Sequence, residues 1–225
     1  MNKLNHVAFI MDGNGRWGKQ RKKGRNFGHI NGVNTVKKIV KSSIKFKIPF
    51  VTFYVFSTEN WKRPKTEINF LFKLITNYFK EELKTVISNG IKINILGKIN
   101  NLPIKIKCIL LEAIKTTKNN KMITVNLAIN YGSKDEILSS FKRIIKKKEK
   151  ITKKTIEKNL YTKNIPNPDI LIRTGTHKRL SNFMLWQLAY AEIYFLNKLW
   201  PDFNERDFKK VITDFHKEKR NFGSI

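Results

Sequence analysis

Short apolar runs alternate with amphipathic stretches along most of the chain. The apolar runs predict six β-strands, at residues 6–11, 50–56, 91–96, 123–130, 170–173 and 193–196. Helical spacing of apolar residues predicts helices at 31–46, 67–88, 103–117, 134–147 and 152–159, and from Glu205 onward. Continuous apolar runs are typical of strands that are covered on both faces. We therefore expect an α/β fold with a six-stranded, mostly parallel sheet flanked by helices.

The predicted helix at 67–88 is apolar over more of its circumference than one buried face requires. One apolar stripe at helical spacing is formed by Ile68, Leu71, Phe72, Ile75, Phe79, Leu83 and Val86. Phe70, Leu74 and Tyr78 add apolar surface beside this stripe. Two readings follow: the helix is simply buried in the core, or one of its faces lines an elongated hydrophobic cavity.

Neither an internal repeat nor a Gly/Ser-rich linker divides the sequence, so we expect one domain over residues 1–225. It has no run of 18 or more apolar residues, which argues against a membrane-spanning helix. The first predicted strand starts within a few residues of Met1, which leaves little room for a signal peptide. These features predict a cytoplasmic protein.

Positive charge dominates the composition: 46 Lys and Arg against 17 Asp and Glu give a formal net charge of +29. This excess indicates either a nucleic-acid-binding surface or a lysine-rich surface composition combined with attraction to a smaller anion. Lys, Asn and Ile are abundant throughout the chain, which favours the second reading. The single cysteine, Cys108, excludes an internal disulfide and a cysteine-based metal site, and we predict a buried, inert thiol.

Candidate chemistry begins where the first predicted strand ends, at residues 12–18. The run GNGRWG formally matches the G-x-G-x-x-G pattern of dinucleotide-binding loops. That pattern needs an acidic residue about 20 positions later, where this chain has Lys38 in a helical stretch. A glycine-rich loop followed by Arg16 and Arg25 suits a diphosphate better. Asp12 beside it is best explained by a hard cation such as Mg²⁺.

Two more polar clusters follow predicted strands, at 56–64 and 172–183. Ligands of open α/β sheets bind beyond the carboxyl ends of the strands, so both clusters could contact the same ligands. The alternatives are a polar loop that caps the next helix and a surface loop with solvated arginines. Glu192 lies among apolar residues, and three readings are open: a metal ligand, a buried partner of an arginine, or a charge at a helix end.

The motifs together resemble cis-prenyltransferases of the undecaprenyl diphosphate synthase family. The matching stretches are HVAFIMDGNGRW, GHINGV, FSTENWKRP, IRTG, RLSNFMLWQLAYAE and LWPDF, and the resemblance extends from residue 6 to about 223. It implies a homodimer with a hydrophobic tunnel, which adds isopentenyl diphosphate repeatedly to an allylic diphosphate such as farnesyl diphosphate. Each new double bond is cis and the reaction uses Mg²⁺. The implied product is undecaprenyl diphosphate, precursor of the lipid carrier in cell-wall polysaccharide synthesis.

The resemblance also implies roles for individual residues. Asp12 corresponds to a catalytic Mg²⁺ ligand, Asn60 to a catalytic residue, and Glu192 to a residue of the same metal region. The allylic diphosphate site corresponds to Gly13, Asn14, Gly15, Arg16, Arg25 and His29. Substrate-facing aromatics correspond to Trp17 and Trp61, and a loop over the substrates to Ser57, Thr58, Glu59, Asn60 and Arg63. The isopentenyl diphosphate site corresponds to Arg173, Arg179 and Ser181.

The chain departs from the family pattern at a few positions. His177 and Lys178 stand where the family usually has Glu-His, so either side chain could serve the metal site. Val55 is bulkier than the alanine often found there, which predicts a shorter product. No D-D-x-x-D motif occurs, which argues against the trans-prenyltransferases. Two alternative functions remain at this point: a non-catalytic prenyltransferase subunit and a basic nucleic-acid-binding protein.

The size of a long product predicts contact with a membrane. Burial of one five-carbon unit contributes up to about 4 kcal/mol, at about 0.8 kcal/mol per carbon. About eleven units would exceed the ceiling of non-covalent affinity, roughly 18–21 kcal/mol. We therefore expect the product tail to reach lipid or solvent, and the protein to associate peripherally with the membrane.

Overall fold

A six-stranded sheet in the order β3-β4-β2-β1-β5-β6 organises the computed structural model, which describes residues 2–219. All five strand pairings are parallel. The strands are β1 (His6–Ile10), β2 (Phe50–Ser57), β3 (Ile91–Leu96), β4 (Ile123–Tyr131), β5 (Ile170–Thr174) and β6 (Glu192–Leu196). The α-helices are α1 (Asn14–Gln20), α2 (Gly24–Lys45), α3 (Lys65–Ser88), α4 (Ile104–Thr117), α5 (Ser133–Lys146), α6 (Lys153–Asn159) and α7 (Glu205–Lys217). Short 3₁₀ segments are η1 (Thr58–Lys62), η2 (Ile99–Asn101) and η3 (Trp200–Asp202).

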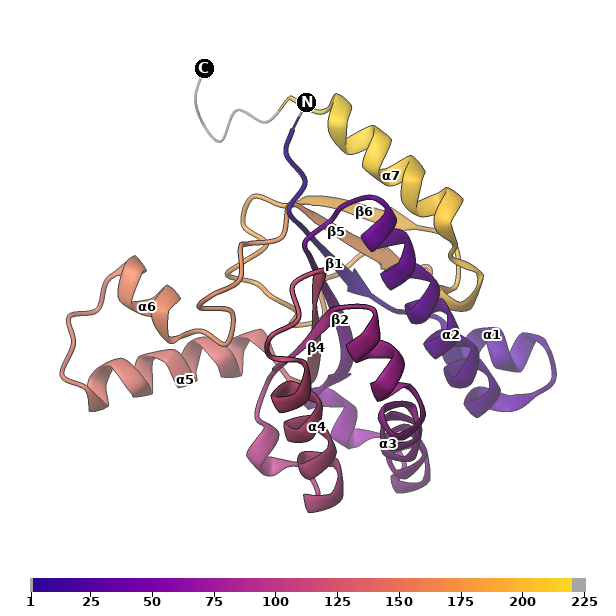
Figure 1. The fold of residues 1–225 in the computed structure, drawn as a ribbon, viewed down its shortest axis with the longest axis horizontal. Helices are drawn as coiled ribbons and strands as arrows, with labels where there is room; N and C mark the ends of the chain where they lie inside the picture. The colour runs from indigo at the N-terminus through magenta and orange to yellow at the C-terminus, as the bar shows by residue number, and fades with distance from the viewer. Residues whose placement is uncertain (1, 220–225) are drawn as a thin grey trace.

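Two layers cover the sheet. Helices α2, α3, α4 and α7 bury their apolar faces against one side of it, in the main hydrophobic core. The other side is covered by Phe183, Met184 and Leu188 from the irregular segment between β5 and β6. Helices α5 and α6 pack on each other and reach away from the sheet (Figure 1). The single-domain α/β fold and all six predicted strands are confirmed, with every strand parallel.

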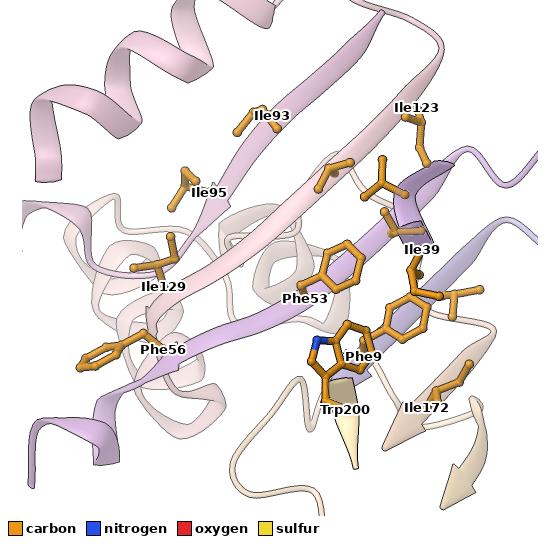
Figure 2. Close-up of a cluster of buried hydrophobic side chains, with 14 of the residues drawn as sticks. Phe9, Ile39, Phe53, Phe56, Ile93, Ile95, Ile123, Ile129, Ile172 and Trp200 are labelled. Atoms are coloured by element: carbon orange, nitrogen blue, oxygen red, sulfur yellow. The ribbon is translucent and has the colours of Figure 1, made fainter. Parts of the chain in front are cut away.

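Aromatic side chains fill the centre of the main core. Phe9 on β1 stacks on Phe53 of the neighbouring β2, with ring centroids 5.0 Å apart (Figure 2). Trp200 packs edge-on against both rings, at 5.9 and 6.2 Å, and its indole N–H donates to the Gly32 carbonyl at 2.9 Å. The core therefore joins the strands to α2 and to the segment after β6.

The glycine-rich stretch after β1 differs from its predicted loop structure. It forms the helix α1, and α2 begins at Gly24 rather than at residue 31. A Cβ on Gly28 would lie 1.8 Å from the Asn14 carbonyl oxygen, and one on Gly18 would lie 2.0 Å from the Gly24 carbonyl oxygen. These glycines let the backbones of α1 and α2 approach each other, a need of tertiary packing that local propensity does not reveal.

Cys108 is exposed, so the prediction of a buried thiol is wrong. Helix α4 buries the face formed by Ile106, Leu110 and Ala113. Cys108 lies two residues from both Ile106 and Leu110, which at about 100° per residue turns its side chain away from that face. Among residues 2–219, no helix is both long and apolar enough to cross a lipid bilayer.

A chain of hydrogen bonds, buried at its centre, crosses four strands on the face opposite the main core. Asn94 donates to Asn126 at 3.1 Å, and Asn126 donates to the Thr52 hydroxyl at 3.0 Å. That hydroxyl lies 2.7 Å from Nε2 of His6, whose Nδ1 lies 2.7 Å from the Pro166 carbonyl oxygen. A carbonyl only accepts, so Nδ1 carries the proton and Nε2 accepts from Thr52. The chain is satisfied only while His6 is neutral.

His6 makes stability depend on pH. Burial lowers the pKa of His6 from 6.5 to about 4, so the unfolded chain binds a proton on acidification before the folded chain does. The free energy of unfolding should fall as pH drops below 6.5, by about 2 kcal/mol between pH 7.5 and pH 5. Urea denaturation at both pH values measures this loss. The His6→Gln variant should be less stable at pH 7.5, but its free energy of unfolding should not show the decrease that His6 causes between pH 7.5 and pH 5. An equal decrease in both proteins would contradict the role assigned to His6.

Candidate active site

A polar cleft opens where β1, β2 and β5 end, at the carboxyl edge of the parallel sheet. Its empty space is about 1590 Å³ with the open mouth included. Five arginines line it: Arg16, Arg25, Arg63, Arg173 and Arg179. Because neighbouring parallel strands end at the same edge, segments more than 100 residues apart in sequence meet in this cleft.

The ion pair between Asp12 and Arg173 joins two neighbouring strands at the floor of the cleft. Arg173 pairs in register with Ile10 of β1, two residues before Asp12. Its guanidinium donates to the Asp12 carboxylate at 2.9 Å, and its side chain is only 4% exposed. Arg16 donates to the other carboxylate oxygen at 3.1 Å. Burial raises the pKa of Asp12, but the hydrogen bond from Arg173 and the charges of both arginines outweigh it and lower the pKa below its ordinary value.

The loop after β5 also accepts hydrogen bonds from Arg173. Arg173 donates to the Ser181 hydroxyl at 2.8 Å and to the Arg179 carbonyl. Ser181 and Asn182 have φ angles of 52° and 62°, in the left-handed region that non-glycine residues rarely adopt. Strained backbone of this kind persists where surrounding contacts impose it and is concentrated at functional sites. Nε of Arg173 is buried and has no hydrogen-bond partner among the described residues.

Glu67 organises the opposite wall of the cleft. Its carboxylate accepts two hydrogen bonds from Arg25, at 2.9 and 3.1 Å, and one from Arg63 at 3.0 Å. Nε2 of His29 lies 3.4 Å from the same carboxylate, and the Glu67 side chain is 11% exposed. Burial raises the pKa of Glu67, but the hydrogen bond and charge of Arg25, with Arg63, lower it overall. An ionised Glu67 thus aligns three basic side chains, two from α2 and that of Arg63 from the link between η1 and α3.

The loop after β2 is ordered by its own polar residues. Ser57 and Asn60 form a reciprocal capping box, in which the Ser57 N–H donates to Asn60 at 3.2 Å. Asn182 donates to the Glu59 carboxylate at 2.8 Å and so ties this loop to the one after β5. This box caps η1 within the loop, whereas the next helix, α3, has Pro64 at its N-cap and no side-chain cap, so the expected capping of that helix is not found. Ser57, Glu59 and Asn60 also line the cleft.

An apolar cavity continues from the polar cleft along the sheet. It lies between α2, α3 and the strands β2, β4 and β3, and its empty space is about 980 Å³ with its opening included. Cavity and cleft share five lining residues: Met11, Asn14, His29, Val55 and Leu71. Both readings of the predicted helix at 67–88 hold, because Ile68 and Phe72 are buried in the core while Leu71, Leu74, Ile75 and Tyr78 line this cavity.

The cleft brings most of the predicted site residues together. These are Asp12, Gly13, Asn14, Gly15, Arg16, Arg25, His29, Ser57, Glu59, Asn60, Arg63, Arg173, Arg179 and Ser181. His177 also lines it, whereas Lys178 is absent from its lining.

Three predicted residues point elsewhere. Trp17 is buried, stacks on Phe27 at 5.5 Å and donates to Asp202 at 2.6 Å, so it lies outside the lining of the cleft and its contact with substrate stays a prediction. Trp61 donates to Asn130 at 2.8 Å, outside the lining of the cleft. The Thr58 hydroxyl donates to Glu59 at 3.2 Å and is likewise outside that lining. The family resemblance implied substrate contact for both indoles; in this structure Trp17 packs on Phe27, and Trp61 packs on Phe56 and Phe72.

Glu192 does not share a metal site with Asp12 within one chain. Glu192 is the first residue of β6, level with Ile170 and, through it, with Val7. Asp12 lies five residues beyond Val7, roughly 17 Å further along the strand direction. The two carboxylates therefore lie at opposite edges of the sheet, which the sequence spacing could not show.

Comparison with known proteins decides the family. A family model described as "Putative undecaprenyl diphosphate synthase" matches residues 10–223. An isoprenyl transferase of Fusobacterium nucleatum is 44% identical over 98% of this chain and 96% of its own length. The chain belongs to the undecaprenyl diphosphate synthase family of prenyltransferases. It is thus an enzyme that transfers prenyl groups, as its motifs predict.

Solved structures of the family share the whole fold. A probable undecaprenyl diphosphate synthase from Campylobacter jejuni is 37% identical, covers 100% of both chains and superposes with a TM-score of 0.86. Lavandulyl diphosphate synthase from Lavandula x intermedia, in complex with dimethylallyl diphosphate, is 31% identical over 98% of both chains, with a TM-score of 0.93. Neither comparison supports the two alternative functions considered from the sequence.

The residues of this prenyltransferase fit the Mg²⁺ that the family implies. Residues 2–219 contain no cluster of three or more His, Cys, Asp or Glu that could enclose a metal ion. Mg²⁺ does not need such a cage, because it is usually held by one or two carboxylates together with substrate phosphates and water. Asp12 is ionised, half-buried and beside the cleft, so one carboxylate is available for that arrangement.

Glu67 is the main site residue that sequence reasoning missed. Its signal was its spacing, four residues after Arg63 at the start of a predicted helix, where such residues face each other. Asn182 was missed as well, because its contact with Glu59 spans 123 residues of sequence.

We expect Glu67→Gln to lower the free energy of unfolding by about 2 kcal/mol, because hydrogen bonds between charged groups contribute about 1.5–3 kcal/mol. Urea denaturation measures the change. Glu81→Gln, on the exposed side of α3, is the matched control and should change stability by less than about 0.5 kcal/mol. Equal effects of the two substitutions would contradict the role assigned to Glu67.

Proposed function

We propose that this enzyme condenses isopentenyl diphosphate repeatedly with an allylic diphosphate, such as farnesyl diphosphate, in a Mg²⁺-dependent reaction. The proposed product is a long-chain cis-polyprenyl diphosphate, with undecaprenyl diphosphate as the specific case. One observation carries the proposal: a cleft with five arginines opens directly into an apolar cavity. This combination matches an amphipathic substrate with a diphosphate head and a hydrocarbon tail.

The basic groups of the cleft form two sets, one for each diphosphate. Arg25 and His29 belong to the wall that Glu67 organises, beside the opening of the apolar cavity. Arg173 and Arg179 belong to the loop after β5. We assign the first set to the allylic diphosphate, whose tail enters the cavity, and the second to isopentenyl diphosphate. Guanidinium groups bind phosphate oxygens through paired, charge-assisted hydrogen bonds.

The arrangement suits the breaking of an allylic carbon–oxygen bond. That bond breaks as a carbon–carbon bond forms to the terminal alkene carbon of isopentenyl diphosphate, which then loses a proton to a diphosphate oxygen in the cleft. Negative charge grows on the departing diphosphate, and Arg16 and Arg25 are already oriented to stabilise it. Mg²⁺, held by Asp12 and the phosphates, would supply further positive charge at that point.

The apolar cavity is the proposed tunnel for the growing chain. The lavender relative named above binds dimethylallyl diphosphate, an allylic diphosphate, with the same fold. That relative is named for lavandulyl diphosphate, so product identity depends on the lining of the cavity and on the substrates rather than on the fold.

The proposed quaternary state is a homodimer, as the family resemblance implies. Exposed apolar side chains outside the cleft are compatible with a protein interface, among them Leu138 and Ile145 on α5 and Ile193 on the edge strand β6. Sedimentation equilibrium measures the mass in solution.

Asp12→Asn should reduce turnover at least 100-fold and leave the fold intact, because the amide keeps hydrogen-bonding capacity but lacks the charge that holds Mg²⁺. The assay incubates purified protein with radiolabelled isopentenyl diphosphate, farnesyl diphosphate and Mg²⁺, and extracts the lipid product. Circular dichroism checks the fold, and Asp135→Asn, which removes a surface ion pair with Lys98, is the control. Absence of lipid product from the unaltered protein would refute the proposed reaction.

Val55→Ala should shift the product distribution towards longer chains, because Val55 lines the cavity where it joins the cleft. Mass spectrometry of the extracted products measures the shift. Val51→Ala, in the core outside the cavity lining, is the control for general loosening of the fold. The same product lengths in all three proteins would rule out a restriction at Val55.

A further inference from the structure

The apolar cavity extends from one edge of the sheet towards the other. Along α3 its lining runs from Leu71 to Val86, fifteen positions further along, which corresponds to about 22 Å of helix. On the sheet, its lining passes from Val55 near the carboxyl end of β2 to Ile91, the first residue of β3. The far end of the cavity therefore lies at the amino edge, opposite the polar cleft.

Two exposed apolar side chains belong to segments next to this far end. Ile87, next to Val86 of the cavity lining, is 39% exposed, and Met122 in the loop before β4 is 61% exposed. The end of α3 and the loop before β4 are joined by backbone contacts, since the Met122 N–H donates to the Gly90 carbonyl at 3.0 Å. Asn120 also donates to the Ile91 carbonyl at 2.8 Å.

The same surface is strongly basic. Segments 84–92 and 115–122 contain five lysines and no Asp or Glu: Lys84, Lys92, Lys115, Lys118 and Lys121. None of these lysines has an ion-pair partner among the residues that the structure describes. The nearest acids in sequence are Glu81 and Glu82 on α3, the second of which pairs with Lys37, and Glu112 on α4. We call Lys84, Ile87, Lys118, Lys121 and Met122 the amino-edge surface.

We propose that the amino-edge surface docks on a lipid bilayer with anionic headgroups, so that the far end of the apolar cavity meets the membrane. This inference rests on the proposed function, because a product of many isoprenoid units exceeds what a dry cavity can enclose. Exposed lysines attract anionic headgroups, and apolar tips among them insert at the boundary between headgroups and acyl chains. Water solvates the lysines well but the exposed apolar side chains of Ile87 and Met122 poorly, whereas a lipid surface binds both kinds of side chain.

Vesicle co-sedimentation without any prenyl diphosphate tests the docking independently of catalysis. The protein should bind phosphatidylcholine vesicles that contain about one-third phosphatidylglycerol, and bind pure phosphatidylcholine much more weakly. Each lysine contributes about fivefold, so the triple variant K84E/K118E/K121E should bind at least about 100-fold more weakly. The control variant K142E/K146E/K150E makes the same change of charge on and just after α5. It should lose less of its binding to the anionic vesicles than K84E/K118E/K121E does.

Met122→Asp tests the apolar contact, with Ile104→Asp as its control. Ile104 is 71% exposed, but it lies at the start of α4, near the carboxyl edge of the sheet. Met122→Asp should weaken binding to the anionic vesicles about tenfold more than Ile104→Asp does. Turnover in detergent should be unchanged in all four variants, and circular dichroism confirms that each is folded.

The proposal would be overturned if the amino-edge variants and their controls lost vesicle binding equally. The positive charge of the protein would then attract lipid without a specific docking surface. If K84E/K118E/K121E lost binding to RNA but kept its binding to vesicles, the lysines would serve nucleic-acid binding and the docking proposal would fail. If the unaltered protein makes no lipid product but its amino-edge surface still binds vesicles selectively, the proposed reaction fails and the docking stands.

Discussion

The charge of Arg173 has to be neutralised inside the protein, because its side chain is almost fully buried and an unpaired buried charge costs several kcal/mol. Asp12 at the end of the neighbouring strand supplies the counter-charge at 2.9 Å. The same guanidinium donates to Ser181 and to the Arg179 carbonyl, which holds the loop after β5 against the cleft. One ion pair between adjacent parallel strands therefore determines where the carboxylate, two loops and much of the positive charge are placed.

The two edges of the sheet differ because parallel strands all end on the same side. Polar loops gather at the carboxyl edge, where Glu67 and Asp12 hold arginines that would otherwise repel one another. From there the apolar cavity follows the sheet towards its amino edge. An enzyme with this arrangement binds the charged and the apolar parts of one substrate in adjoining spaces of different polarity.

Much of the architecture was predictable because it is encoded locally. Each strand is a short apolar run, so even the less apolar strand β6 was found within one residue of its start. The helix α1 was misread because Gly15 and Gly18 have low helix propensity, while the real constraint on Gly18 is the contact between α1 and α2. Trp17 and Glu192 were expected in the cleft because of the family resemblance, whereas helix packing and strand register set their positions in the structure.

The sequence by itself determined the α/β class, the parallel sheet, the family and the set of charged residues at strand ends, because periodicity and motifs are properties of neighbouring residues. Only the tertiary structure decided that Glu67 orders three basic groups, that Glu192 is remote from Asp12, and that the cavity joins the cleft at Val55. Those facts depend on side chains that meet across tens to more than a hundred residues. Such contacts follow from strand order and helix packing, which local sequence patterns do not specify.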